Sequence, residues 1–152
     1  MKVEIRLEKG LEEPKVIILA GEETEEVRAL AARLGELRLA PVPVRRGEER
    51  LLLPQEQFLT FYTDGKGVSA RTGEGTYAVP LRLYELEELL DQSRFARISN
   101  GEIINLDKVT AVDLSLGGTI RMTLEGRVCA YVSRRYVKKI KETLKTGRRR
   151  NQ

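Results

Sequence analysis

The sequence predicts a mainly β fold, in which a domain of short antiparallel strands with a small helix and a C-terminal helix follows a small α+β extension. Short runs of alternating apolar and polar residues recur between residues 58 and 132, with turn residues between them. A strand, helix and strand pattern precedes these runs, and a basic amphipathic pattern follows them. The length of 152 residues suits one ordinary core with a small appendage.

The extension is expected to comprise residues 1–47. Residues 2–7 alternate in the manner of a half-buried strand, and residues 16–20 form a continuous apolar run that is typical of a second strand. A helix is predicted within residues 22–35, because glutamates crowd its first turn and an apolar stripe at helical spacing ends at a glycine. A further strand is expected near residues 37–44. Such a unit is too small to hold a core alone.

The β domain is expected to span residues 48–146, with the polar residues 45–49 as the boundary. Residues 147–152 are expected to form a disordered basic tail. A helix is predicted at residues 81–90, where leucines recur on one face after Pro80. Strands are predicted at residues 58–63, 68–71, 76–79, 109–114, 119–124 and 127–132.

Residues 95–106 carry the most informative pattern, because it fits neither a plain helix nor a plain strand. We interpret it as a strand, a polar turn and a second strand. Its polar residues Arg97, Ser99 and Asn100 all form hydrogen bonds readily, and a basic helix pattern follows about thirty residues later. This combination favours a surface that reads nucleic acid.

Three polar residues of this segment also have structural interpretations. Asn100 is a candidate turn residue that holds its own backbone, and for Asn105 the corresponding interpretation, a cap on the loop after a strand, is preferred. Arg97 has two candidate roles. It either binds phosphate or pairs with a carboxylate such as Asp107 or Glu102 to brace the turn.

The positive charge of the chain is concentrated near its C-terminal end. Residues 134–150 hold nine Lys and Arg residues against Glu142 alone, whereas the formal net charge of the whole chain is +4. A basic segment beside a mildly acidic body indicates a local contact with a polyanion, although a solvated tail is the ordinary alternative. Ser133 is expected to cap the last helix, and its N–H groups together with Arg135 suit a phosphate. The predicted cationic stripe consists of Arg134, Lys138, Lys141 and Lys145.

The composition argues against an enzyme, a metal site and a bound cofactor. The chain has no histidine, and Cys129 is its single cysteine, so the commonest general base and metal ligands are missing. Cys129 falls in an alternating strand pattern and is interpreted as a structural or surface residue. No apolar run approaches the length needed to cross a bilayer, and a cytoplasmic location is expected.

Residues 49–144 resemble the LytTR DNA-binding domain of bacterial transcription regulators. The resemblance rests on the strands before Asp64-Gly65, the helix at residues 81–90, the segment that begins Phe95-x-Arg97, and the run Val132-Ser133-Arg134-Arg135-Tyr136-Val137. It implies a β domain that places loops, rather than a recognition helix, in successive major grooves of DNA. The chain is similar to the small stand-alone members without a receiver domain.

The resemblance also implies a set of DNA-contacting residues. Asn100 takes the position that reads a base edge, where its amide suits adenine, and Arg135 near the start of the last helix suits guanine. Lys66 in the loop after the first strand aligns with a third contact. The further expected contacts are Arg97, Ser99, Ser133, Arg134, Lys138 and Lys141.

Two departures from the family pattern carry expectations. Many members have His, then Arg or Lys, then Ser where this chain has Ser99, Asn100 and Gly101, so we expect a more flexible loop and a different operator preference. No aspartate precedes Asp64, so phosphoaspartate control is not expected in this polypeptide.

The expected partners are double-stranded DNA, a second copy of the chain on paired repeats, and a small membrane protein of the kind that often accompanies such regulators. No small-molecule substrate is expected. The alternative function is an RNA-binding β protein of the translation apparatus, since a basic tail serves any phosphate backbone. The aromatic residues lie mostly in core phase, however, which does not favour a stacking surface for single-stranded RNA.

Overall fold

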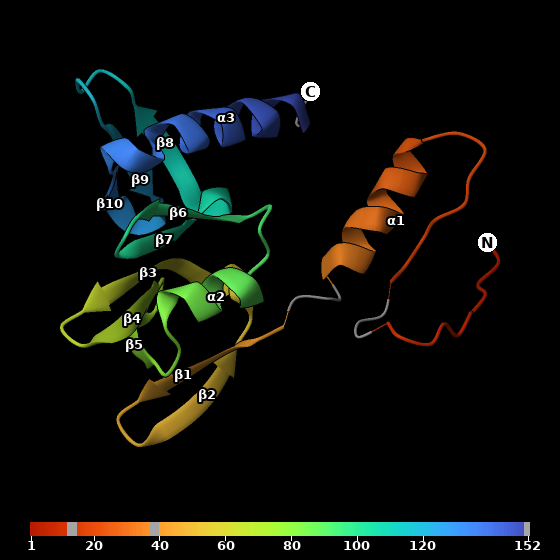
Figure 1. Ribbon diagram of the computed structural model, residues 1–152, viewed down its shortest axis with the longest axis horizontal. Helices are drawn as coiled ribbons and strands as arrows, with labels where there is room; N and C mark the ends of the chain where they lie inside the picture. The colour runs from red at the N-terminus through yellow and green to blue at the C-terminus, as the bar shows by residue number, and fades with distance from the viewer. Residues whose placement is uncertain (12–14, 37–39, 151–152) are drawn as a thin grey trace. The chain divides into compact units, whose positions relative to one another are not determined.

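The computed structural model describes residues 1–11, 15–36 and 40–150. The chain divides into two compact units, Met1–Arg38 and Leu39–Gln152, and each is described by itself (Figure 1). In the first unit, helix α1 (Glu25–Glu36) begins where the Val27 N–H donates to Thr24 Oγ1 at 3.2 Å. This bond and the acidic first turn stabilise the start of the helix, and of these two features the sequence predicted the acidic turn.

The two strands predicted before this helix, at residues 2–7 and 16–20, do not form. Both segments lack strand pairing in the structure, so this prediction is wrong. Alternation satisfies one requirement of a strand, but the backbone N–H and C=O groups also need a neighbouring strand. No described residue of the first unit is buried, and even Val27, Leu30 and Leu34 of α1 are half-buried at most.

The second unit contains two antiparallel sheets, and the strands and helices predicted between residues 58 and 145 are confirmed in place and type. A seven-stranded sheet has the order β2-β1-β5-β4-β3-β7-β6, and a three-stranded sheet has the order β10-β9-β8. The strands are β1 (Val42–Arg46), β2 (Glu49–Leu53), β3 (Phe58–Asp64), β4 (Gly67–Thr72), β5 (Gly75–Val79), β6 (Phe95–Ser99), β7 (Glu102–Asn105), β8 (Val109–Asp113), β9 (Ile120–Leu124) and β10 (Val128–Val132). The helices are α2 (Leu83–Leu89) and α3 (Arg134–Arg150).

The expected domain boundary at residues 45–49 lies inside the sheet. These residues form the end of β1, a turn and the start of β2, with Arg46 opposite Glu49. Strand β1 also pairs with β5, and its residues Val42 and Val44 are buried. The compact unit therefore begins before residue 48, because polar residues occur in an exposed hairpin turn as readily as in a linker.

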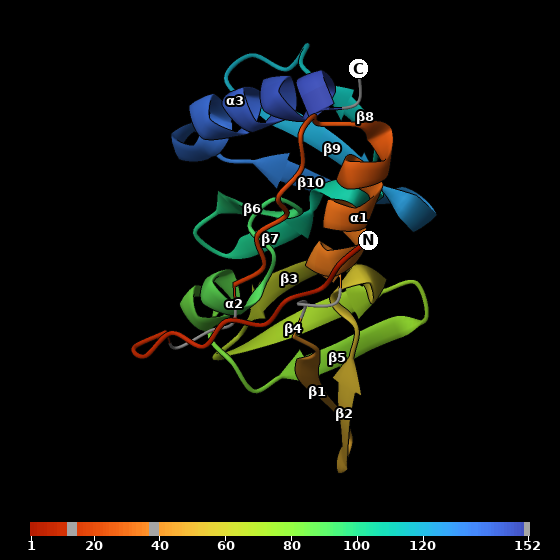
Figure 2. The same ribbon diagram turned by 90° about the vertical axis from the view of Figure 1, so that its right-hand side faces the viewer.

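Two apolar cores hold the second unit together. In the first core, α2 packs on the seven-stranded sheet, and Phe61 lies with its ring centroid 4.7 Å from Phe58 and 6.0 Å from Phe95. The second core joins the far end of that sheet to the three-stranded sheet and to α3, which contributes the fully buried Ile140 (Figure 2). Together these cores fix the start of α3 relative to the turns of the larger sheet.

Asn105 has the structural role that was preferred for it. Its buried side chain donates from Nδ2 to the Phe58 carbonyl at 2.9 Å and accepts at Oδ1 from the Asp107 N–H at 3.0 Å. Helix α3 differs from expectation at its other end, because it continues to Arg150 where a disordered tail was expected from residue 147. Residues 151–152 of that expected tail lie outside the described residues. Among the described helices, none is long and apolar enough to span a bilayer.

Candidate nucleic-acid interface

The turn between β6 and β7 is held on both sides of Gly101. The Gly101 N–H donates to Ser99 Oγ at 3.2 Å, and its carbonyl accepts from the Thr63 N–H at 2.9 Å. A Cβ atom added at Gly101 would lie 2.7 Å from Thr63 Oγ1, a distance too short for real Cβ contacts. Glycine therefore allows β3 to approach the turn closely. These contacts hold the turn in place, which differs from the more flexible loop expected from the sequence.

The side chain of Arg97 also holds this turn in place. Its Nε donates to the Ser99 carbonyl at 2.9 Å, and a terminal nitrogen donates to the Asn100 carbonyl. Its other terminal nitrogen pairs with Glu87 Oε1 of α2, which is neither of the carboxylates considered from the sequence. The side chain of Arg97 is 20% exposed, and its hydrogen bonds hold the backbone at Asn100 in place. The pairing was missed because Glu87 belongs to another element and no sequence pattern links the two.

A side-chain hydrogen bond joins this turn to the start of α3. Tyr136 Oη donates to Asn100 Oδ1 at 3.1 Å, and the Ser133 N–H donates to the Ile98 carbonyl at 2.8 Å. Arg135 stands beside Tyr136 on the exposed side of the helix start. Tyr136 was not among the residues expected at the interface. Its partner lies 36 residues away in the sequence, so the pattern around it carries no signal for this contact.

Three candidate contacts from the sequence thus lie on neighbouring segments. Lys66 is exposed in the turn between β3 and β4, Asn100 is exposed in the turn between β6 and β7, and Arg135 is exposed on α3. Figure 1 shows these two turns and the start of α3 one above another on the left side of the second unit. Hydrogen bonds connect the end of β3 to the second turn and the second turn to α3. We use the name turn surface for the β3–β4 turn, the β6–β7 turn and the start of α3, with their exposed residues Lys66, Asn100 and Arg135.

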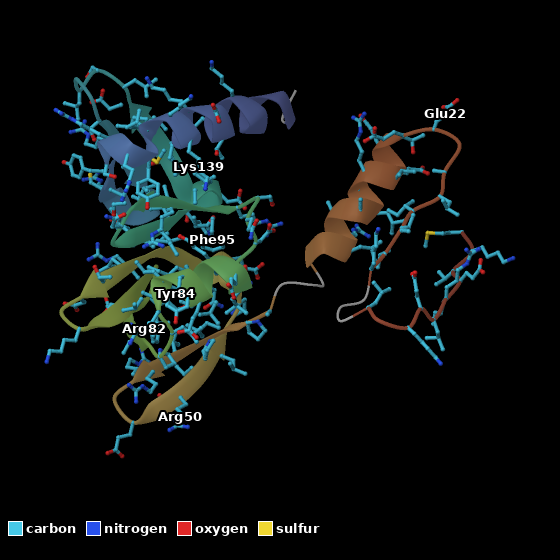
Figure 3. The ribbon with its side chains drawn as sticks, in the orientation of Figure 1. Glu22, Arg50, Arg82, Tyr84, Phe95 and Lys139 are labelled. Carbon is cyan, nitrogen blue, oxygen red and sulfur yellow. The ribbon has the colours of Figure 1, made fainter. Side chains whose placement is uncertain are left out.

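The cationic residues of α3 continue from the turn surface along the helix. The side chain of Arg134 lies against the turn between β8 and β9, where a Cβ atom added at Gly118 would be 3.2 Å from Arg134 Nε. Lys138 and Lys141 are exposed, as expected, and so is Lys139, which is labelled in Figure 3. An exposed row of cations next to polar turns produces a local positive field that attracts a polyanion.

Glu102 is the acidic residue closest in sequence to the turn. Burial raises the pKa of its carboxyl group above the ordinary value, and this effect outweighs the hydrogen bond from Thr60 Oγ1 at 2.6 Å and the positive charge of Arg71. The half-buried Glu102 side chain is thus held against β3 next to the turn.

Comparison with known families identifies the domain. The profile of the LytTr DNA-binding domain matches residues 48–145. The chain belongs to this family. A solved LytTr DNA-binding domain from Bacillus cereus superposes with a TM-score of 0.66 at 19% identity, covering 69% of this chain and 96% of that one. The LytTr fold expected from the sequence is thereby confirmed.

Proteins similar to this chain in sequence include uncharacterized HTH-type transcriptional regulators of Staphylococcus aureus. Those of strains COL and MRSA252 are 44% and 43% identical over 86 residues, which is 57% of this chain and 58% of theirs. The chain thus matches somewhat more than half of the length of these relatives. In the part of this LytTr chain that the structure describes, strands separate every pair of α-helices, so no helix-turn-helix occurs there.

Proposed function

We propose that this LytTr chain is a sequence-specific DNA-binding regulator of transcription, which presents the turn surface to the major groove of double-stranded DNA. The observation that carries the proposal is the hydrogen bond between Tyr136 and Asn100. It links the turn between β6 and β7 to α3, so that Asn100 and Arg135 have a fixed relation to each other before any ligand binds. A preorganised pair of this kind loses less conformational entropy when it binds.

The two side chains have the chemistry of base recognition. Asn100 Oδ1 accepts from Tyr136, and a carbonyl oxygen has a second lone pair, so the oriented amide still accepts and donates as the N6 and N7 atoms of adenine require. Arg135 has the planar donor fork that matches guanine O6 and N7. We assign sequence discrimination to these two residues, and we assign Ser99, Arg97 and Ser133 to holding the segments in place.

Contacts with phosphate come from the cations around this pair. Lys66 on the β3–β4 turn and Arg134, Lys138 and Lys141 on α3 are exposed, and such contacts position a protein on DNA without reading its sequence. The proposed RNA-binding alternative gains no support, because the exposed aromatic side chains among the described residues, Tyr84 and Tyr131, belong to different elements.

The test begins by selecting a preferred sequence from random duplex DNA with the intact chain. Asn100→Ala and Arg135→Ala are each expected to weaken binding to the selected sequence by about 1–3 kcal/mol, because each removes a bidentate base contact. Binding to random duplex is expected to change little. Gel shifts or fluorescence anisotropy at one fixed salt concentration measure both affinities.

Arg50→Ala is the matched control, since Arg50 is an exposed cation on β2 at the opposite end of the sheet (Figure 3). It is expected to leave both affinities unchanged. Equal losses on selected and random duplex in the Asn100 and Arg135 variants would instead assign those residues to the DNA backbone. Failure to select any sequence would reject the proposed function.

We further propose that two copies bind paired repeats in the cytoplasm of a bacterial cell. The resemblance to small regulators supports this arrangement, and it also supports a small membrane protein as a partner of the chain. Footprinting on the DNA upstream of the gene, followed by gel shifts on one repeat and on two, measures the repeat spacing and the cooperativity.

A further inference from the structure

Residues 2–8 alternate between charged and apolar side chains, and the structure leaves both kinds exposed. Val3, Ile5 and Leu7 are 79%, 85% and 96% exposed. Among the charged side chains, Arg6 Nε lies 3.3 Å from Glu4 Oε1. Side chains two residues apart share a side of an extended chain, so this contact fits an extended backbone at these residues. The structure nevertheless contains no strand at these residues.

We propose that residues 2–8 of two copies of the chain pair as antiparallel strands about a two-fold axis at Ile5. This strand pairing supplies the second copy that binding to paired repeats requires, and in this respect the inference rests on the proposed function. The apolar side chains of both strands then lie on one face, and the charged ones lie on the other. The cross-strand pairs in this register are Lys2 with Glu8, Glu4 with Arg6, Val3 with Leu7, and Ile5 with Ile5 of the second copy.

The charges specify this register over its neighbours. A shift by two residues in one direction places Glu4 opposite Glu8 and Arg6 opposite Arg6, and a shift in the other places Glu4 opposite Glu4. A shift by one residue puts the apolar side chains on the charged face. In a parallel pair in register, each charged side chain lies opposite the same residue of the second copy. Opposite charges facing each other across strands stabilise a pair and like charges destabilise it, so the proposed register is favoured over all of these.

The rest of the first unit offers apolar surface to cover such a ribbon. Ile17 and Leu19 are 67% and 90% exposed, and the apolar stripe of α1 is half-buried. A two-stranded ribbon alone is marginal in water, so the pairing depends on this cover from both copies. DNA is a poor alternative occupant, because residues 1–38 contain nine glutamates and seven Lys or Arg residues.

The first test exchanges the charges in the intact chain. Glu4→Arg and Arg6→Glu each place like charges opposite one another twice in the symmetric dimer, and each is expected to raise the dimer dissociation constant about tenfold. The double variant restores opposite charges and is expected to regain the parental constant. Sedimentation equilibrium measures all four proteins. A monomeric parent, or a double variant that dimerises no better than the single ones, would overturn the proposal.

The second test maps the register by disulfide formation in a Cys129→Ser background, which removes the exposed native thiol. Ile5→Cys is expected to form a covalent dimer on oxidation, because the two residues 5 face each other at a disulfide-compatible distance. Val3→Cys alone is expected to remain uncrosslinked. Mixed with Leu7→Cys it is expected to form the heterodimer. Equal crosslinking at residue 3 alone would contradict the two-fold register.

Binding to a single DNA repeat separates this inference from the proposed function. The single variants Glu4→Arg and Arg6→Glu are expected to bind one repeat with parental affinity and to lose cooperativity on two, and the double variant is expected to match the parent on both. A parent that binds one repeat but stays monomeric at all protein concentrations overturns the strand pairing and leaves the DNA-binding proposal intact. A parent that dimerises in the stated register but binds no DNA sequence rejects the proposed function instead.

Discussion

In the second unit the strands bury Phe58, Phe61 and Ile104 completely, whereas in the first unit none of the described residues is buried. Both units contain segments with the alternation of a strand. The difference lies in what surrounds them, because each strand of the second unit has a hydrogen-bonded neighbour and a second layer to pack against. Alternation therefore indicates which side a strand would bury, and the neighbours decide whether it forms.

This contrast places both apolar cores and the proposed DNA contacts in the second unit, and the proposed association of two copies in the first. The unit beginning at Leu39 contains both apolar cores and every candidate contact with DNA. The unit ending at Arg38 offers exposed apolar side chains without a core. Changes on the two sides of this division should therefore have different consequences.

Two truncations test the division with the largest expected effect. Removal of residues 1–47 deletes β1 and with it the buried side chains of Val42 and Val44. It should therefore lower the free energy of unfolding by about 1.5–3 kcal/mol for each of these two side chains. Removal of residues 1–38 keeps β1 and should leave the urea unfolding midpoint almost unchanged. The shorter deletion should also bind one DNA repeat normally and lose cooperativity on two. If the two deletions were equally stable, β1 would not belong to the core.

A pair of substitutions sharpens the same contrast. Phe61→Ala should lower the free energy of unfolding by about 3–5 kcal/mol, because it removes a fully buried ring between two others. Leu19→Ala, at a 90% exposed side chain, should change it by less than about 0.5 kcal/mol in the monomer. Urea denaturation followed by circular dichroism at low protein concentration measures both. A large effect of the Leu19 change in a monomer would reveal packing in the first unit.

The sequence predicted the second unit well because its signals are local. Turn residues and alternation placed the strands from residue 58 onward, and the amphipathic pattern after residue 132 placed α3, whose Val137, Ile140 and Leu144 pack on the second core. The same rules placed strands in the first unit that do not form. Alternation at residues 2–7 and 16–20 does not say whether either segment has a neighbouring strand.

The candidate site was predictable in its residue types and not in its connections. Asn100 and Arg135 followed from motifs, and their roles in DNA binding stay predictions. The bonds of Asn100 to Tyr136 and of Arg97 to Glu87 join different elements, and only the folded chain brings them together. The close approach at Gly101 was predicted in the opposite sense, as flexibility, because the sequence does not show that Thr63 lies against it.

The salt dependence of DNA binding tests whether the electrostatic contacts also belong to the second unit. Replacement of Lys138, Lys141 and Lys145 by Ala should lower the slope of log K against log salt by about 0.9 for each phosphate group that the variant no longer neutralises, on every duplex sequence. The matched control replaces three cations of the first unit, Lys9, Lys15 and Arg33. It should leave the slope unchanged on one repeat. A parental slope in the α3 variant would mean that this row does not reach the DNA.

The smallest expected effect concerns backbone strain. Arg127, between β9 and β10, has a φ of +61°, in the left-handed region that disfavours residues with a Cβ atom, and the surrounding sheet holds it there. Arg127→Gly should raise the free energy of unfolding by about 0.5–1 kcal/mol, because relief of the strain exceeds the added entropy of glycine in the unfolded chain. Gly10 in the first unit has a φ of +96°. Gly10→Ala should leave the unfolding midpoint unchanged, because no buried packing forces that residue to keep its conformation. Equal and opposite shifts at the two positions would mean that the first unit unfolds together with the second.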